Sequence, residues 1–177
     1  MITRLYVMIN MIKTMTMKKN SKEKGMTLVE TMVALVVLTI GLIPILGVVT
    51  SSITLAIRIE NNLIAANLAQ EGIEVVRAIR DASWMNSDLF DKDLPGGDYL
   101  VAWDSTSLIP FNPDVHLKIK DNGVYSYDAA SPDTIFKRQI NITKMAGGEL
   151  KVVSKVTWTE RQQNKTVDIE SYLFDWQ

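Results

Sequence analysis

The chain has 177 residues, of which 47% are hydrophobic and 22% charged, and its formal net charge is −1. This length suits one modest domain with an accessory segment. The chain contains no cysteine, which excludes disulfide scaffolds, thiolate metal sites and cysteine nucleophiles. Residues 1–25 hold six basic residues and one glutamate, whereas the rest of the chain is acidic. Direct nucleic-acid binding is not expected, because no basic stripe follows residue 25.

The first predicted element is an apolar helix after the basic segment. No residue from Thr31 to Val49 is charged, and residues 32–49 alone form a helix about 27 Å long, close to the thickness of the hydrocarbon core of a bilayer. A buried core helix usually has a polar face, and a secretory signal has a shorter apolar region and a clear cleavage site. A basic head, an apolar run and an acidic body therefore predict a single-pass membrane helix with its N-terminus in the cytoplasm.

Glu30 and Pro44 do not fit a plain membrane anchor. A carboxylate in lipid costs about 2.5–3.5 kcal/mol, so Glu30 marks a function or a partner unless it lies at the interface beside Lys24. Pro44 removes a backbone N–H and clashes with the preceding turn, and Gly41 and Gly47 weaken the helix further. We expect a kink or a local opening around Pro44, a feature that membrane helices also tolerate.

The stretch KGMTLVETMVALVVLTIGL resembles the N-terminus of type IV prepilins and pseudopilins. The shared pattern is a basic leader ending in Gly, then a hydrophobic residue, Thr, Leu, an aliphatic residue and Glu, followed by a long apolar helix. Many members have Phe where this chain has Met26. The leader, residues 1–25, is long for the family, but Met17 would give a leader of conventional length and is an alternative start.

The resemblance implies that a prepilin peptidase cuts after Gly25 and methylates the new amine of Met26. It also implies that Glu30 faces the N-terminal ammonium of a neighbouring subunit in a filament and sets the register between helices. Pro44 would let the helix bend or melt there, although it lies a few residues earlier than in many pilins. The implied partners are the prepilin peptidase, other pilin or pseudopilin subunits, the inner-membrane assembly platform and, before assembly, the lipid bilayer.

Residues 51–83 continue as an amphipathic helix, because apolar residues recur at spacings of 3 and 4. The predicted apolar stripe is Leu55, Ile59, Leu63, Ala66, Ala69 or Gln70, Ile73, Val76 and Ile79. The predicted polar side is Arg58, Glu60, Asn61, Asn62, Glu71, Glu74 and Arg77. Glu74 precedes Arg77 by three residues, which favours an ion pair. Such a helix needs a sheet or a partner to cover its stripe.

The C-terminal part reads as a β-sheet head. We predict a loop at 84–97, a short strand at 99–103, a hairpin turning at Asp-Asn-Gly, and strands at 136–144, 150–159 and 166–176. The last three strands form an antiparallel meander, extended by the hairpin and packed on the amphipathic helix. The fold class is α+β, organised as leader 1–25, membrane-spanning half of the helix 26–50, amphipathic half 51–83 and head 84–177.

Catalytic and metal sites find little support. His116 is the only histidine and is expected to be exposed or structural, and no phosphate loop or nucleophile motif occurs. The chain is therefore not expected to be an enzyme or to need a cofactor. Asp91, Asp93 and Asp98 lie with Asp88 in a loop that could hold calcium, but their spacing does not match an EF-hand, so a solvated acidic loop is favoured.

The predicted function is a structural subunit, a minor pilin or pseudopilin, of a type IV pilus or a type II secretion-like filament. It would be a single-pass precursor in the cytoplasmic (inner) membrane and later part of an extracytoplasmic filament. The alternative is a membrane-anchored extracytoplasmic binding module whose signal anchor is not cleaved. An anchored enzyme is a third class, without a catalytic constellation in its favour.

Overall fold

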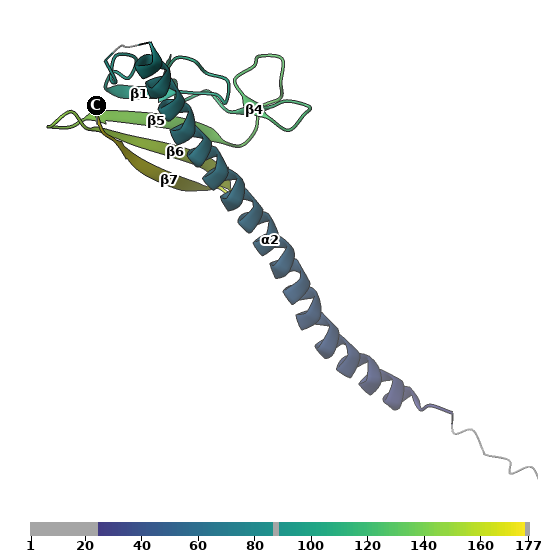
Figure 1. The fold of residues 1–177 in the computed structure, drawn as a ribbon. Helices are drawn as coiled ribbons and strands as arrows, with labels where there is room; N and C mark the ends of the chain where they lie inside the picture. Colours follow the sequence, from purple (N-terminus) through teal and green to yellow (C-terminus); the bar gives the residue numbers. More distant parts are fainter. Residues whose placement is uncertain (1–24, 87–88, 176–177) are drawn as a thin grey trace, which may run out of the picture. The chain divides into compact units, whose positions relative to one another are not determined.

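The computed structural model describes residues 25–86 and 89–175, and the chain divides into two compact units, Met1–Ser51 and Ser52–Gln177. The fold class is α+β, as predicted: a long N-terminal helix and a small antiparallel sheet (Figure 1). The predicted leader lies outside the described residues except for Gly25. The alternative start at Met17 and Asp88 of the acidic loop lie outside them as well.

Helix α2 (Leu28–Met85) supplies the regular structure of the described part of the first unit. The helix begins at Leu28 because the side-chain oxygen of Thr27 accepts a hydrogen bond of 3.2 Å from the backbone N–H of Glu30. Within the first unit, every large apolar side chain from Met26 onward is at least 47% exposed. This part of the helix therefore has no core of its own.

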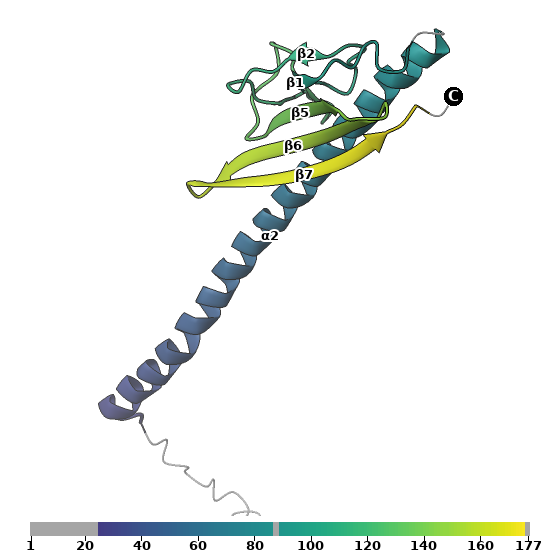
Figure 2. The same ribbon diagram turned by 90° about the vertical axis from the view of Figure 1, so that its left-hand side faces the viewer.

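In the second unit, the rest of α2 packs on one face of a five-stranded sheet (Figure 1, Figure 2). The strands are β1 (Gly97–Leu100), β2 (Ile109–Pro110), β5 (Lys137–Lys144), β6 (Leu150–Glu160) and β7 (Gln163–Leu173), in the order β2-β1-β5-β6-β7. All neighbours pair antiparallel. The meander of β5, β6 and β7 matches the prediction, because the alternation of apolar and polar residues along each strand fixes which face is buried.

The predicted hairpin forms, but it does not extend this sheet. Its strands β3 (Lys118–Ile119) and β4 (Tyr125–Ser126) make a separate two-stranded sheet, and β1 and β2 extend the meander instead. The cause is local: Leu117, just before β3, exchanges backbone hydrogen bonds with Thr134 and Phe136, the segment that leads into β5. That exchange occupies the polar groups that a longer strand would offer to the meander.

The turn between β6 and β7 is shorter than predicted, since Glu160 already pairs with Gln163. Only Arg161 and Gln162 make the turn, with φ of 48° and 63°. Left-handed backbone costs residues other than glycine about 1–2 kcal/mol each, and Asn-Gly is the usual solution for a two-residue hairpin turn. The turn is therefore built from residues that strain it.

The sheet covers a shorter part of the helix than the predicted stripe suggests. Leu55, Ile59 and Leu63 are 53–61% exposed, so the sheet does not cover this part of the predicted stripe, and its cover by a partner stays a prediction. Burial starts ten residues later than the first of these positions, and the buried helix residues are Ala65, Leu68, Ala69, Gly72, Ile73, Val75, Val76, Ile79 and Ser83. Glu160 and Arg161, at the end of β6, still contact Arg58 and Thr54, so the sheet reaches this part of the helix without covering its apolar stripe, and periodicity alone overestimates the covered length.

Gly72 allows α2 to approach the sheet closely. A β-carbon at this position would lie 2.5 Å from Ser154 Oγ on β6 and 2.8 Å from the side chain of Ile140 on β5. Both distances are shorter than real contacts of that kind, so a larger residue at this position makes the side chains of Ser154 and Ile140 shift. Gly72 thus permits the close approach of helix and sheet between the two core clusters.

Candidate functional site

The predicted processing site precedes the first turn of α2. Gly25 and Met26 are exposed, with Met26 at 68%, and no described atom lies within 4 Å of the place where a β-carbon of Gly25 would be. Both residues precede the first hydrogen-bonded turn, which begins at Leu28. No described residue therefore blocks the access of an enzyme to the peptide bond between Gly25 and Met26.

Glu30 is the third residue of the helix and is exposed. Its backbone N–H is capped by Thr27, and an acidic side chain in the first turn is stabilised by the positive end of the helix dipole. The sequence reading missed this local role, although Thr followed three residues later by Glu is the signature of a capping box. A cap explains why a carboxylate is tolerated at this position, but not what its exposed oxygens contact.

Pro44 lies inside α2, which is assigned as continuous through it. The predicted kink or opening in a membrane or a filament stays a prediction. Gly41 and Gly47 are exposed, and apart from their chain neighbours and the nearby helix backbone no described atom lies within 4 Å of a β-carbon built on either. Within the described chain, nothing about these two positions requires glycine.

The hydroxyl groups of the apolar half of the helix are all bonded to its own backbone. Thr31, Thr39, Thr50 and Ser51 each donate to a carbonyl oxygen three or four residues earlier, at 2.7–3.0 Å. Hydroxyls satisfied in this way do not need water. The helix is also long and apolar enough, by length and composition, to cross a membrane.

The head contains a buried cation that the sequence reading did not single out. Arg138 on β5 is fully buried, and its guanidinium bonds the Glu71 carboxylate at 2.9 Å and the carbonyl oxygen of Leu68 at 2.8 Å. It also donates to the carbonyl oxygen of Val101, after β1. Glu71 was predicted on the polar side of the helix, and this prediction is wrong, since its side chain is only 33% exposed and pairs with the sheet.

Tyr127 lies beside this cation. Burial raises the pKa of the Tyr127 phenol above its usual 10.0, and the neighbouring Arg138 charge offsets part of this rise. The raised pKa keeps the phenol neutral inside the head. The hydrogen bonds of Arg138 tie the helix, the loop after β1 and the sheet together.

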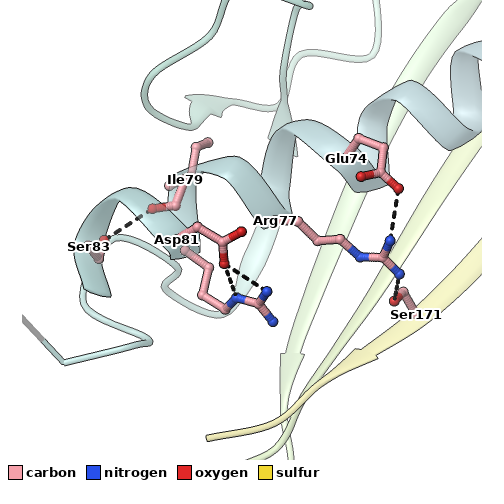
Figure 3. A network of polar contacts seen from close by, with 7 residues as sticks. Glu74, Arg77, Ile79, Asp81, Ser83 and Ser171 are labelled. Carbon is pink, nitrogen blue, oxygen red and sulfur yellow. Dashed lines mark hydrogen bonds and ion pairs between the residues drawn. The ribbon is translucent and has the colours of Figure 1, made fainter. Parts of the chain in front are cut away.

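Arg77 makes a second link between α2 and the sheet. It bonds Glu74 at 2.8 Å, which is the predicted ion pair, and it donates to Ser171 Oγ on β7 at 3.0 Å (Figure 3). Both charged side chains are well exposed, at 42% and 67%. A pair of this kind contributes little to stability, because water competes for each partner.

The three aspartates of the acidic loop are bound by three different partners. Asp91 pairs with Lys144 at 2.6 Å, Asp93 accepts a hydrogen bond from Ser83 at 2.7 Å, and Asp98 accepts one from Asn141 at 2.7 Å. Among the described residues, no group of three or more His, Asp or Glu side chains is placed to hold a metal ion. The structure therefore does not bring these aspartates together as a calcium site.

Residues 20–46 match the family model of the prokaryotic N-terminal methylation motif. The match contains Gly25, Met26, Glu30, Gly41 and Pro44, and it ends one residue before Gly47. It covers residues 28–46 of the exposed helix of the first unit and none of the head. No curated protein and no solved structure gives a significant match to the chain.

Proposed function

We propose that this chain, whose N-terminus carries the type IV prepilin signature, is a minor pilin or pseudopilin of a type IV pilus or type II secretion-like filament. The signature supports a type IV pilin-like precursor and, with the apolar helix, fits a protein of the inner membrane. The family is structural rather than catalytic. The observation that carries the proposal is that the matched segment is also the part of the helix without a core of its own.

Processing is the first step of the proposed function. Prepilin peptidase cleaves after Gly25, on the cytoplasmic side of the inner membrane, and methylates the amine of Met26. The exposed peptide ahead of the first helical turn supports this step, because a protease needs an extended, accessible chain. Leader removal leaves Met26 as the first residue, four positions before Glu30.

Membrane residence is the second step. The apolar half of α2 crosses the inner membrane once, with the basic leader in the cytoplasm. Its threonine and serine hydroxyls are already bonded to the backbone. Glu30 is the only charged side chain between residues 26 and 50. This residue needs a cationic partner once water is removed.

Assembly is the third step, in which the exposed helix becomes the core of a filament through contact with other subunits and the inner-membrane assembly platform. Glu30 pairs with the N-terminal ammonium of a neighbouring subunit. Two unit charges 4 Å apart attract by about 4 kcal/mol at an effective dielectric constant of 20, before desolvation is subtracted. Gly41 and Gly47 let neighbouring helices approach closely, and Pro44 lets the helix bend there.

Mass spectrometry of the N-terminus tests the processing step. The full chain is produced in a host with a prepilin peptidase, and the expected product begins at N-methylated Met26. Gly25→Val is expected to keep the leader, whereas the matched variant Gly47→Val is expected to be processed normally. An intact leader on the unaltered chain would overturn the proposal and favour the uncleaved, membrane-anchored binding module.

Glu30→Gln tests the assembly step. It keeps the size of the side chain and removes the charge, so membrane insertion and cleavage are expected to be unchanged, while incorporation into filaments falls at least about tenfold, the equivalent of about 1.4 kcal/mol. The measurement is the amount of the variant in sheared filaments relative to the membrane fraction. Glu60→Gln, another helix carboxylate, is the control, and equal incorporation of both variants would contradict the role of Glu30.

A further inference from the structure

The turn between β6 and β7 contacts α2 close to the end of the apolar run. Arg161 donates to Thr54 Oγ1 at 2.7 Å, and Glu160 pairs with Arg58 at 3.4 Å. Thr54 comes five residues after Val49, the last residue of the run, which corresponds to about 7.5 Å along a helix. Chain connectivity alone therefore keeps this turn within reach of the surface of any bilayer that holds the run.

The turn is strained, because its two left-handed residues have a charged and an amide side chain and neither is a glycine. Arg161 and Gln162 both have left-handed φ angles, at positions where Asn-Gly fits without strain. Strained backbone persists where the surrounding structure holds it in place, and it clusters at functional sites. Here the strain coincides with an arginine held against the helix, which points to a function for the side chain of Arg161.

Three cations gather at this end of the head: Arg58, Arg161 and Lys165. In the ion pair of Arg58 with Glu160, the arginine side chain is 47% exposed and the glutamate side chain only 12%, so the cation is the more accessible partner. Glu60 follows Arg58 by two residues and so projects from the other side of the helix. It lies near Tyr125, whose pKa is raised by burial and, to a smaller extent, by the negative charge of Glu60. The surface presented by the turn is therefore cationic.

We propose that this cationic turn, defined as Arg58, Arg161 and Lys165, binds the anionic phospholipid headgroups of the bilayer that holds the apolar helix. The inference rests on the proposed function only in placing that helix in a membrane before assembly. Guanidinium groups suit phosphate because they offer parallel N–H donors, and cations next to a membrane span are attracted to anionic lipid. The contact holds the head at the membrane surface through its β6–β7 end until the subunit enters a filament.

Site-specific fluorescence can test this contact, because the chain has no cysteine of its own. A single cysteine replaces Gln162 in the turn, and a matched variant carries one at Ala146, in the exposed β5–β6 turn at the opposite end of these strands. Each full-length variant is labelled with a fluorophore. It is then reconstituted into vesicles of phosphatidylcholine alone or of equal parts phosphatidylcholine and phosphatidylglycerol, both with a headgroup-attached nitroxide quencher.

The label at position 162 is expected to be quenched at least about twofold more in the anionic vesicles, and high salt is expected to abolish the difference. The label at position 146 should not respond to lipid charge. Replacing all three cations by glutamine should remove the response, whereas replacing Arg58 and Arg161 by lysine should retain it. Circular dichroism spectra that match the unaltered chain show that the head remains folded in each variant.

Two results would overturn the inference. Equal quenching of the label at position 162 in neutral and anionic vesicles would exclude headgroup binding even though the chain is inserted. A loss of filament incorporation without any change in quenching in the glutamine variant would assign the cations to a neighbouring subunit. Failure of the unaltered chain to float with vesicles would instead remove the membrane step of the proposed function, and with it this contact.

Discussion

The two units of the chain differ in how the apolar side chains of α2 are covered. In the first unit, the apolar residues of α2 are exposed and the glycines at 41 and 47 have open space around them. In the second unit, the same helix is covered by a sheet, and a β-carbon at its glycine 72 would meet side chains of two strands. One continuous helix thus serves two purposes. Its C-terminal half completes a folded head, and its N-terminal half needs lipid or other subunits to cover it.

Polar groups follow the same division. The head buries a guanidinium, Arg138, and surrounds it with a carboxylate and two carbonyl oxygens from its own chain. The exposed half of the helix carries Glu30, whose backbone is capped but whose carboxylate faces outward. A polar residue that the chain satisfies itself indicates a structural role. One that the chain leaves open, on an otherwise apolar surface, indicates a partner.

The largest effect on the head is expected from Arg138→Ala. Removing the guanidinium leaves the Val101 carbonyl and part of the Glu71 charge without this donor and takes one of the donors from the Leu68 carbonyl, so the free energy of unfolding should fall by about 3 kcal/mol. Denaturant unfolding of the full chain in detergent, followed by tryptophan fluorescence, measures the loss.

Arg77→Ala is the matched control for this prediction. It removes an exposed arginine that also links helix and sheet, and it should cost less than about 1 kcal/mol. A double variant, Glu71→Gln with Arg138→Met, should recover part of the loss because no buried charge remains. Equal losses for Arg77→Ala and Arg138→Ala would show that burial of the guanidinium does not matter.

A smaller effect is expected from alanine at the glycines, and its sign should differ between the two units. Gly72→Ala places a methyl group against Ser154 and Ile140 and should destabilise the head by about 1–3 kcal/mol. Gly47→Ala meets no atom of the described chain and should favour the helix by up to about 1 kcal/mol.

Thermal unfolding and helix content by circular dichroism measure the two glycine variants side by side in detergent. In filaments, Gly47→Ala should be unfavourable if neighbouring helices pack against this position, although it stabilises the isolated helix, because the methyl group would then obstruct assembly. Destabilisation of the isolated chain by Gly47→Ala would show that the first unit has internal contacts after all.

The sequence predicted those features that depend on periodicity. Alternation along β6 identified Leu150, Val152, Val156 and Trp158 as one buried face, and helical spacing identified Ile73, Val76 and Ile79 as covered. The prepilin resemblance rested on consecutive residues, so it needed no tertiary structure and was matched over residues 20–46.

The features that the sequence did not predict depend on contacts between distant residues. Glu71 reads as a surface residue until β5 places Arg138 opposite it, although Arg138 stands in the inward-facing phase between Phe136 and Ile140 and could have been noticed. The hairpin of β3 and β4 has a local signal in its turn, but its separation from the main sheet has none. The strained turn at Arg161 has none either, because arginine and glutamine are not typical of left-handed turns.

The smallest predicted effect is the pH dependence of the stability of the head, which tests how completely Tyr127 is buried. The pKa of Tyr127 is raised by burial, so the phenol is protonated more readily in the folded head than in the unfolded chain. Its contribution to stability is therefore complete below the unfolded pKa of about 10 and is lost as the pH rises through the folded pKa.

Tyr127→Phe should flatten this alkaline decline in thermal stability, measured between pH 9 and about pH 11.5. An unchanged decline in the Tyr127 variant would mean that its hydroxyl reaches water, and that the head is less closed around Arg138 than its contacts indicate.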